Sequence, residues 1–223
     1  MTVAERKQRE KEQRRVEIIN AAEKLFFSRG YDSVSVEDIA KEADLSKGTL
    51  FVYFINKEDL FFAVVLRGTE ILSSMFEESI NERGRGNKIN RGPSRAYFEF
   101  VKKYPDYHRI ISYYQSGRFD PEKIAQNETA RKIADLRKEI FLMLEDAVKN
   151  DIGCGTFRTG VKPVEIVVLL TVIAEGIAAM RPDLQEALKI RGVTPDQFLS
   201  DVIDLEHFML MNNGQQEENA KGL

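Results

Sequence analysis

The segment at residues 46–53, SKGTLFVY, combines a cation, hydroxyl groups and a glycine within a short helical pattern. Leu50 and Phe54 are four residues apart and therefore share one helix face, which would turn toward a core. The residues that lie off that face are polar or small, namely Lys47, Gly48, Thr49 and Tyr53. Lysine and hydroxyl groups suit base edges and phosphates, and a glycine allows a close backbone approach. The chemistry that this segment favours is therefore binding of nucleic acid.

The residues before this segment position it as the second of two short helices joined by a tight turn. Ser35 precedes Val-Glu-Asp and is expected to cap the first helix, whose carboxylates lie in its first turn. Asp44 falls at the turn, where aspartate tolerates a left-handed backbone. Ser46 is expected to cap the second helix. Asn56 is expected to cap a third, at whose start Lys57 could hold a phosphate. This order of elements is that of a helix-turn-helix.

The charge of the chain is slightly negative overall but is basic at the N-terminus. The formal net charge is −3, so bulk charge does not argue for a nucleic-acid partner. Between Arg6 and Arg15, however, six basic residues stand against two acidic ones. A basic arm beside a helix-turn-helix can follow phosphates or enter a minor groove, and Arg14 is one candidate contact. The alternative interpretation is a solvated, frayed start of the first helix.

The run SVEDIAKEADLSKGTLFVYFINKEDL, preceded by IINAAEKLFFSRGYDS, resembles the N-terminal domain of TetR-family transcriptional regulators from about Arg14 to Phe62. The chain departs from the family pattern at Asp44, where glycine is usual, and at Phe51, where tyrosine is frequent. The resemblance implies a dimer that binds double-stranded DNA and is released by a ligand. The residues expected to contact DNA are Ser35, Ser46, Lys47, Gly48, Thr49, Tyr53, Lys57 and Arg14.

The rest of the chain predicts an all-α fold, because helical periodicity recurs and no strictly alternating strand pattern occurs. We expect an N-terminal three-helix helix-turn-helix domain at 1–60, a larger helical ligand-binding and dimerisation domain at 61–212, and a disordered polar tail at 213–223. The predicted helices span approximately 14–28, 57–81, 93–103, 106–115, 121–150, 163–180 and 194–211, besides the two short ones.

The helices at 163–180 and 194–211 predict a homodimer. The first is apolar nearly all round, so that it must be covered on every side. The second carries a stripe formed by Phe198, Val202, Leu205 and Met209. Two such helices from each of two chains would form a four-helix bundle, and a two-fold dimer matches a palindromic operator. The alternative is a core hairpin inside a monomer.

A cluster of aromatic residues between 97 and 114 predicts a pocket for a small-molecule effector. Aromatic walls with a few polar tips are typical of sites for apolar ligands. The residues expected to line it are Phe98, Tyr104, Tyr107, His108, Tyr114, Phe141, Thr171 and Glu175. The alternative is that the aromatic residues only fill the core. Glu175 is a carboxylate in an apolar helix. It would bind a ligand, form an ion pair with a basic side chain across the dimer, or face solvent.

Other classes of protein find little support in the sequence. The two histidines, His108 and His207, stand far apart, without metal-ligand spacing or a glycine-rich phosphate loop. We therefore expect no enzyme, no metal and no cofactor. The single cysteine, Cys154, fits a reducing compartment. The charged N-terminus lacks an apolar signal region, and the longest apolar run is too short to span a membrane. These features predict a cytoplasmic protein with no membrane partner.

These observations predict a ligand-responsive transcriptional regulator, expected to be a repressor. It would bind a palindromic operator as a dimer and be released by a small apolar or aromatic-contacting ligand. The alternative is a helical small-molecule-binding protein that does not bind DNA. Salt dependence separates the two, because counterion release weakens DNA binding steeply as salt rises.

Overall fold

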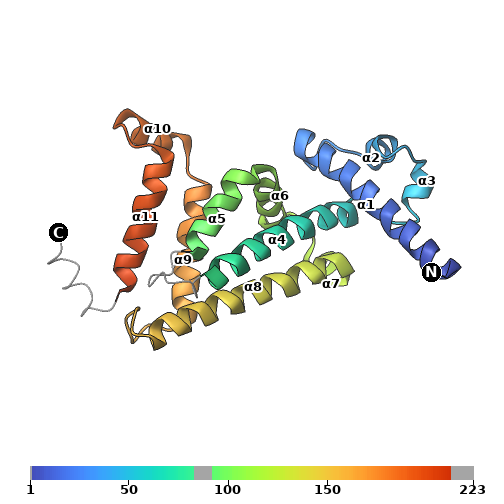
Figure 1. The fold of residues 1–223 in the computed structure, drawn as a ribbon. Helices are drawn as coiled ribbons and strands as arrows, with labels where there is room; N and C mark the ends of the chain where they lie inside the picture. The colour runs from blue at the N-terminus through green and yellow to red at the C-terminus, as the bar shows by residue number, and fades with distance from the viewer. Residues whose placement is uncertain (1, 83–91, 212–223) are drawn as a thin grey trace. The chain divides into compact units, whose positions relative to one another are not determined.

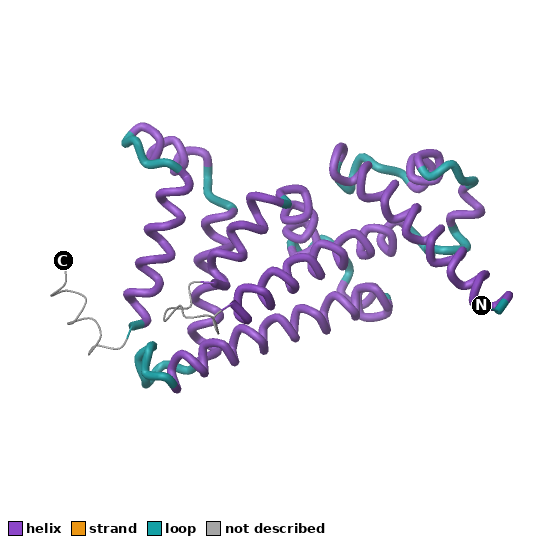
Figure 2. The backbone as a smooth tube through the Cα atoms, viewed as in Figure 1, coloured by secondary structure: helices purple, strands orange, loops and turns teal. Residues whose placement is uncertain are grey.

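The computed structural model describes residues 2–82 and 92–211, and the polar tail expected at 213–223 lies outside them. Within these ranges the chain is helical, and the extended backbone amounts to an isolated bridge between Phe157 and Met211. Figure 2 shows helices joined by loops throughout the described chain. The predicted all-α fold is therefore confirmed.

The helices follow one another in the order shown in Figure 1. Their bounds are α1 Val3–Arg29, α2 Val36–Glu42, α3 Lys47–Leu50, α4 Lys57–Asn81, α5 Gly92–Lys103, α6 Pro105–Gln115, α7 Pro121–Gln126, α8 Glu128–Gly153, α9 Pro163–Ala178, α10 Pro182–Ile190 and α11 Pro195–Leu210.

The chain forms two compact units, which alternate along the sequence. Unit 1 consists of Met1–Ile71 and Tyr104–Leu136, and unit 2 consists of Leu72–Lys103 and Arg137–Leu223. Helices α4 and α8 each contribute residues to both. The domain boundaries expected at 60 and 212 separate regions of different expected function, and they stay a prediction. By compactness, α6, α7 and the start of α8 belong to the same unit as the helix-turn-helix.

Helix α1 is longer than expected and explains how the first unit is organised. It begins at a capping box, in which the Thr2 hydroxyl accepts a hydrogen bond from the Glu5 amide and the Glu5 carboxylate accepts one from the Thr2 amide. It ends at Gly30, whose φ of 75° is left-handed and favours glycine. The stripe predicted from its sequence is buried: Ile18, Ala21, Ala22, Leu25 and Phe26. The basic residues before position 14 are therefore helical and exposed.

A cluster of aromatic rings holds α6 and the following loop to the N-terminal helices of unit 1. The ring of Phe61 lies 5.4 Å from that of Phe26 and 5.6 Å from that of Tyr113, centroid to centroid. Phe119 stacks on Phe61 at 5.4 Å, and Tyr114 meets Phe62 edge-on at 5.5 Å. Such aromatic pairs contribute about 0.5–1.5 kcal/mol beyond the area they bury.

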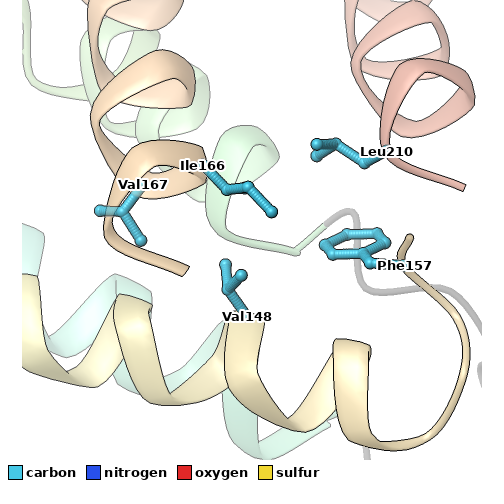
Figure 3. Packing of buried hydrophobic residues seen from close by; sticks show 5 residues of the cluster. All are labelled: Val148, Phe157, Ile166, Val167 and Leu210. Carbon is cyan, nitrogen blue, oxygen red and sulfur yellow. The ribbon is translucent and has the colours of Figure 1, made fainter. Parts of the chain in front are cut away.

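The core of unit 2 joins α8, α9, α11 and the loop between α8 and α9. Figure 3 shows Val148, Phe157, Ile166, Val167 and Leu210 converging on one another. A second cluster brings α5 into the same unit through Phe98, Ala174 and Ile203. Each buried aliphatic or aromatic side chain stabilises this packing by roughly 1.5–3 kcal/mol.

One prediction about helix limits was wrong, and one helix had not been predicted. The single helix expected at 121–150 is two helices, because Asn127 adopts an extended backbone (ψ 126°) and its side-chain oxygen caps α8 by accepting from the Ala130 amide at 2.9 Å. Helix α10 was not expected. It has Pro182 at its first position, which preorganises a helix start.

The helix expected at 163–180 is only partly covered by the described residues of its own chain, and its cover by a second chain stays a prediction. Ile166, Val167 and Ala174 of α9 are buried, but Val168 is 48% and Val172 is 61% exposed.

Among the described helices none is by itself long and apolar enough to cross a membrane, and α9 and α10 meet that criterion only as a pair bent by 80°.

Candidate nucleic-acid interface

Helix α2 is fixed by a capping box at Ser35. The Ser35 hydroxyl accepts from the Asp38 amide at 3.1 Å and donates to the Asp38 carboxylate at 2.7 Å, which also accepts from the Ser35 amide. The hydrogen bond from the Ser35 side chain holds the pKa of Asp38 below its usual range. The predicted cap is confirmed. Because the hydroxyl hydrogen is used within the cap, a DNA contact by Ser35 stays a prediction that would require breaking this bond.

The turn between α2 and α3 has the geometry that the sequence predicted. Asp44 has a φ of 54°, and among described residues other than glycine it is alone in the left-handed region. The amide of Leu45 then bonds to the Ala40 carbonyl at 2.8 Å, which closes the turn. Aspartate in this conformation is uncommon but tolerated, so the glycine usual in this turn is not required.

Helix α3 is capped by Ser46, whose hydroxyl accepts from the Thr49 amide at 3.1 Å and lies 2.8 Å from the Thr49 hydroxyl. One of these two hydroxyl groups donates to the other, which leaves the remaining hydroxyl hydrogen available to an external acceptor. Backbone bonds continue the helical turn beyond Leu50, as from Phe54 to the Leu50 carbonyl at 3.1 Å. Leu50 and Phe54 are fully buried, as predicted.

Lys47 is exposed and forms an ion pair with Glu37 of α2. Its ammonium also lies 5.8 Å from the centre of the Phe51 ring. The hydrogen bond from Lys47 lowers the pKa of Glu37. Both side chains of the pair are about half exposed, so that the pair is weak and the ammonium can turn to a phosphate or base.

Lys57 is engaged with the chain itself. Its ammonium donates to the carbonyl oxygens of Tyr31 and Val34, both at 2.9 Å, and lies 4.1 Å from the centre of the Tyr31 ring. These contacts tie the start of α4 to the segment between α1 and α2. A phosphate contact by Lys57, which the sequence suggested, stays a prediction that would require this side chain to leave two carbonyls. The predicted Asn56 cap is confirmed by its bond from the Asp59 amide at 2.8 Å.

The basic start of α1 supplies further exposed cations in the same unit. Arg14 is exposed and pairs with Glu17 at 2.7 Å, and Arg6 pairs with Glu10 at 2.9 Å. Arg15 packs over the Phe54 ring at 5.1 Å, which places the end of this arm against the α3 turn. Arg14 is therefore positioned beside the helix-turn-helix on a regular helix rather than on an irregular arm.

Gly48, Thr49 and Tyr53 complete the predicted reading face. Gly48 has no left-handed backbone, and a β-carbon there would meet nothing closer than the Ser46 hydroxyl oxygen at 3.8 Å. The folded chain therefore does not require glycine at this position. Thr49 is exposed and Tyr53 is half-buried. Val52 also lies on this face and is 71% exposed. The sequence did not indicate it as a contact, because its side chain has no hydrogen-bonding group.

The residues predicted to line a ligand pocket divide between the two units. Tyr104, Tyr107, His108 and Tyr114 belong to unit 1, and Phe98, Phe141, Thr171 and Glu175 belong to unit 2. The Thr171 hydroxyl donates to the Val167 carbonyl at 2.8 Å, and Glu175 is exposed. Burial, followed by the charge of Glu175, raises the pKa of Tyr97 to about 12. The pocket itself stays a prediction.

Tyr107 has a structural role that the sequence did not reveal. Its hydroxyl donates to the Glu23 carboxylate at 2.5 Å, and the same carboxylate accepts from Arg67 at 2.7 Å. Its ring lies against Gly68, where a β-carbon would stand 2.7 Å from the ring. Helices α1, α4 and α6 thus meet at one point of unit 1. No sequence pattern near Tyr107 indicates a partner that lies 84 residues away.

In the described ranges, histidine, cysteine and carboxylate side chains form no group of three or more that could hold a metal ion. Unit 1 exposes cations and hydroxyl groups on α1 and α3.

Comparison with known proteins agrees with this geometry. Residues 18–64 match the family described as bacterial regulatory proteins, tetR family. The transcriptional activator FasR of Mycolicibacterium smegmatis is 23% identical over 159 residues, which cover 71% of this chain and 69% of FasR. The regulator UidR of Escherichia coli is 38% identical over 73 residues, which span 33% of this chain and 37% of UidR. The structure of AibR with isovaleryl coenzyme A and operator DNA has the same fold, with a TM-score of 0.62 at 21% identity over 89% of this chain and 98% of that one.

Proposed function

This chain belongs to the TetR family of transcriptional regulators, and we propose that it is a repressor that binds a palindromic operator as a homodimer and is released by a small apolar effector. The observation that carries the proposal is the reading face of α3. A doubly capped helix-turn-helix presents Lys47, Gly48 and Thr49 away from its core, beside the basic, helical start of α1.

The DNA contacts divide between groups that are available and groups that position others. Lys47 and the Ser46–Thr49 hydroxyl pair are exposed and can meet base edges in the major groove. Tyr53 and Arg14 suit phosphate oxygens. Ser35 and Lys57 hold α2 and the start of α4 in place. In the proposed complex Ser35 and Lys57 act mainly by positioning the reading helix. The backbone amides at the starts of α2 and α4 would then lie next to phosphates.

The homodimer is proposed to form through the helices predicted at 163–180 and 194–211, which are α9 and α11. Val164, Val168 and Val172 lie on one stripe of α9 and are all exposed. Helix α11 exposes Leu205 and Phe208, at 60% and 57%. Large apolar side chains gathered on two helices mark an interaction surface. A second copy of the chain covers them by two-fold symmetry and presents a second reading helix about 34–36 Å away.

Release by an effector is proposed to act through α6. Tyr107 and Tyr114 of α6, both in unit 1, offer aromatic side chains of the kind that an apolar ligand requires. AibR, which shares the fold, was solved with a coenzyme A thioester as well as operator DNA. A ligand that binds one arrangement of α6 more tightly shifts the population toward it. The Tyr107 contact with Glu23 would carry such a shift to α1.

The test is a selection of bound DNA from a random library, followed by a salt titration. We expect the purified protein, a cytoplasmic regulator in this proposal, to retain a sequence with inverted repeats. Its affinity should fall steeply with salt. Lys47→Ala should weaken binding and reduce the slope of log affinity against log salt by about 1. The matched control Lys189→Ala, an exposed lysine of α10, should change neither quantity.

A DNA-independent binding protein is the competing function. It would retain no sequence from the library at low salt, and any ligand affinity would be insensitive to salt. FasR is named an activator, so the sign of regulation needs its own measurement. A reporter gene placed behind the selected site should be expressed more, not less, when the chain is removed.

A further inference from the structure

We propose that Val52 determines sequence specificity by packing against the C5-methyl group of a thymine in the major groove. This inference rests on the proposed function, since it requires α3 to dock on DNA. Val52 is not among the residues that the sequence suggested as DNA contacts. Its role would be to read an apolar feature of a base, whereas Lys47 and Thr49 read hydrogen-bonding groups.

The placement of Val52 follows from the hydrogen-bonded turn that comes directly after α3. Leu50 and Phe54 are 0% and 1% exposed, and they fix which face points to the core. Backbone bonds from Val52 to the Thr49 carbonyl at 3.1 Å and from Phe54 to the Leu50 carbonyl at 3.1 Å hold residues 51–53 in a hydrogen-bonded turn that follows the end of α3 at Leu50. Leu50 and Phe54 turn into the core, and Val52 between them lies on the side of the turn that faces away from the core. Its 71% exposure agrees with that position.

The surroundings of Val52 favour a base over a phosphate. Gly48 lies one turn before it on the same face and adds no side chain. Gly48 therefore places no side chain in front of Val52, which is 71% exposed. The polar groups stand on either side, with Lys47 next to Phe51 and Thr49 next to Ser46. An aliphatic side chain offers nothing to a phosphate oxygen, and thymine alone presents a methyl group in the major groove.

Two neighbouring apolar residues are less suited to this role. Phe51 is 44% exposed, and the Lys47 ammonium lies over its ring. Ile55 is 79% exposed but follows the helical turn, and its amide donates to the Asp59 carboxylate at the start of α4. Ile55 therefore serves as a matched control, because it is an equally exposed aliphatic side chain a few residues away.

The experiment replaces thymines of the selected operator by deoxyuracil, one position at a time. This change removes only the C5-methyl group and leaves base pairing intact. We expect one position in each half-site at which the wild-type protein binds about three- to fivefold more weakly, as for one buried methyl group. Val52→Ala should bind the thymine operator more weakly by a similar factor and should show no further loss with deoxyuracil. Ile55→Ala should keep the wild-type sensitivity.

The outcomes separate this inference from the proposed function. If the wild-type protein selects an operator but no deoxyuracil position matters, the inference fails and the proposed function stands. The same conclusion follows if the loss persists in Val52→Ala, or if it disappears in Ile55→Ala instead. A protein that selects no DNA at all overturns both. The thermal unfolding of Val52→Ala should match that of the wild type, because the side chain is mostly in solvent.

Discussion

At the scale of single residues, Gly48 separates what the fold needs from what DNA binding needs. Its backbone is not left-handed, and the space around its missing β-carbon is open. Glycine in a helix costs about 1 kcal/mol relative to alanine. The chain therefore carries a locally destabilising residue that its own packing does not require. A close approach of DNA to this backbone, as proposed above, would account for the absence of a side chain there.

We predict that Gly48→Ala changes stability and DNA affinity in opposite directions. The free energy of unfolding should rise by about 0.5–1 kcal/mol, since the helix gains a better helix former. Affinity for the operator should fall at least tenfold, because the new methyl group holds the backbone away from the groove. Urea unfolding and an equilibrium DNA-binding assay measure the two quantities. A variant that is more stable and binds equally well would contradict a close approach at Gly48.

Tyr107 gives a second residue-scale prediction, which concerns pH. Burial, followed by the hydrogen bond to Glu23, raises the pKa of Tyr107 above its ordinary value of about 10. The folded state thus keeps this phenol protonated at a pH where the unfolded state ionises. The stabilisation is complete below pH 10 and is lost as the pH rises through the folded-state pKa.

Tyr107→Phe should accordingly lower the free energy of unfolding by about 1–3 kcal/mol near pH 8, because Glu23 loses a hydrogen bond in a half-buried site. The difference between wild type and variant should shrink between pH 10 and pH 11. Urea unfolding at a series of pH values measures it. A difference in unfolding free energy that stays constant with pH would mean that the pKa of Tyr107 is the same in the folded and unfolded states.

At the scale of elements, the contact between α4 and α6 depends on Gly68. A β-carbon at Gly68 would stand 2.7 Å from Cδ1 and 3.2 Å from Cβ of Tyr107, closer than real contacts allow. Tyr107 cannot easily move, because its hydroxyl is held by Glu23 and its ring packs on Phe27 at 5.0 Å. The small residue at position 68 therefore sets how closely α6 lies to α4.

We predict that Gly68→Ala destabilises the protein by about 1–3 kcal/mol, as overpacking does elsewhere, despite the gain in helix propensity. Gly48→Ala is the matched control, since it is the same change in a helix with open space and should stabilise. Urea unfolding compares the two. In a Tyr107→Ala background, where the ring is absent, Gly68→Ala should instead raise the free energy of unfolding, because alanine is the better helix former. If Gly68→Ala alone proves as stable as the wild type, α6 does not press on α4 as described.

The sequence predicted elements well where their signals are local. The caps at Ser35, Ser46 and Asn56 and the left-handed Asp44 lie within a few residues of what they fix, and all four are confirmed. The break at Asn127 had a local signal as well, a capping asparagine three residues before Ala130, which was overlooked. The role of Tyr107 had none. Its partner Glu23 is brought close only by the fold, and aromatic composition alone suggested a ligand wall instead.

At the scale of the whole molecule, the exposed stripe on α9 needs an explanation beyond the single chain. The sequence predicted that helices of a second chain complete the cover of this helix, and in the single chain Val164, Val168 and Val172 are exposed at 38%, 48% and 61%. Leaving such side chains in water forgoes about 25 cal/mol for each Å² of apolar surface that could be buried. A second copy with its α9 and α11 against the same helices removes this surface from water, in agreement with the dimer proposed above.

We predict that Val172→Glu converts the dimer to a monomer, because a carboxylate at the centre of an apolar interface is buried without a partner. Sedimentation equilibrium measures the change. The monomer should lose most of its affinity for the two-half-site operator. In the dimer, binding of one reading helix raises the effective concentration of the other at its half-site, and the monomer lacks this effect. Affinity for a single half-site should be unchanged. Ile190→Glu on α10, at a residue 73% exposed but outside the two predicted interface helices, should remain dimeric. If Ile190→Glu dissociates while Val172→Glu does not, the chains pair through α10 and the exposed stripe of α9 has another partner.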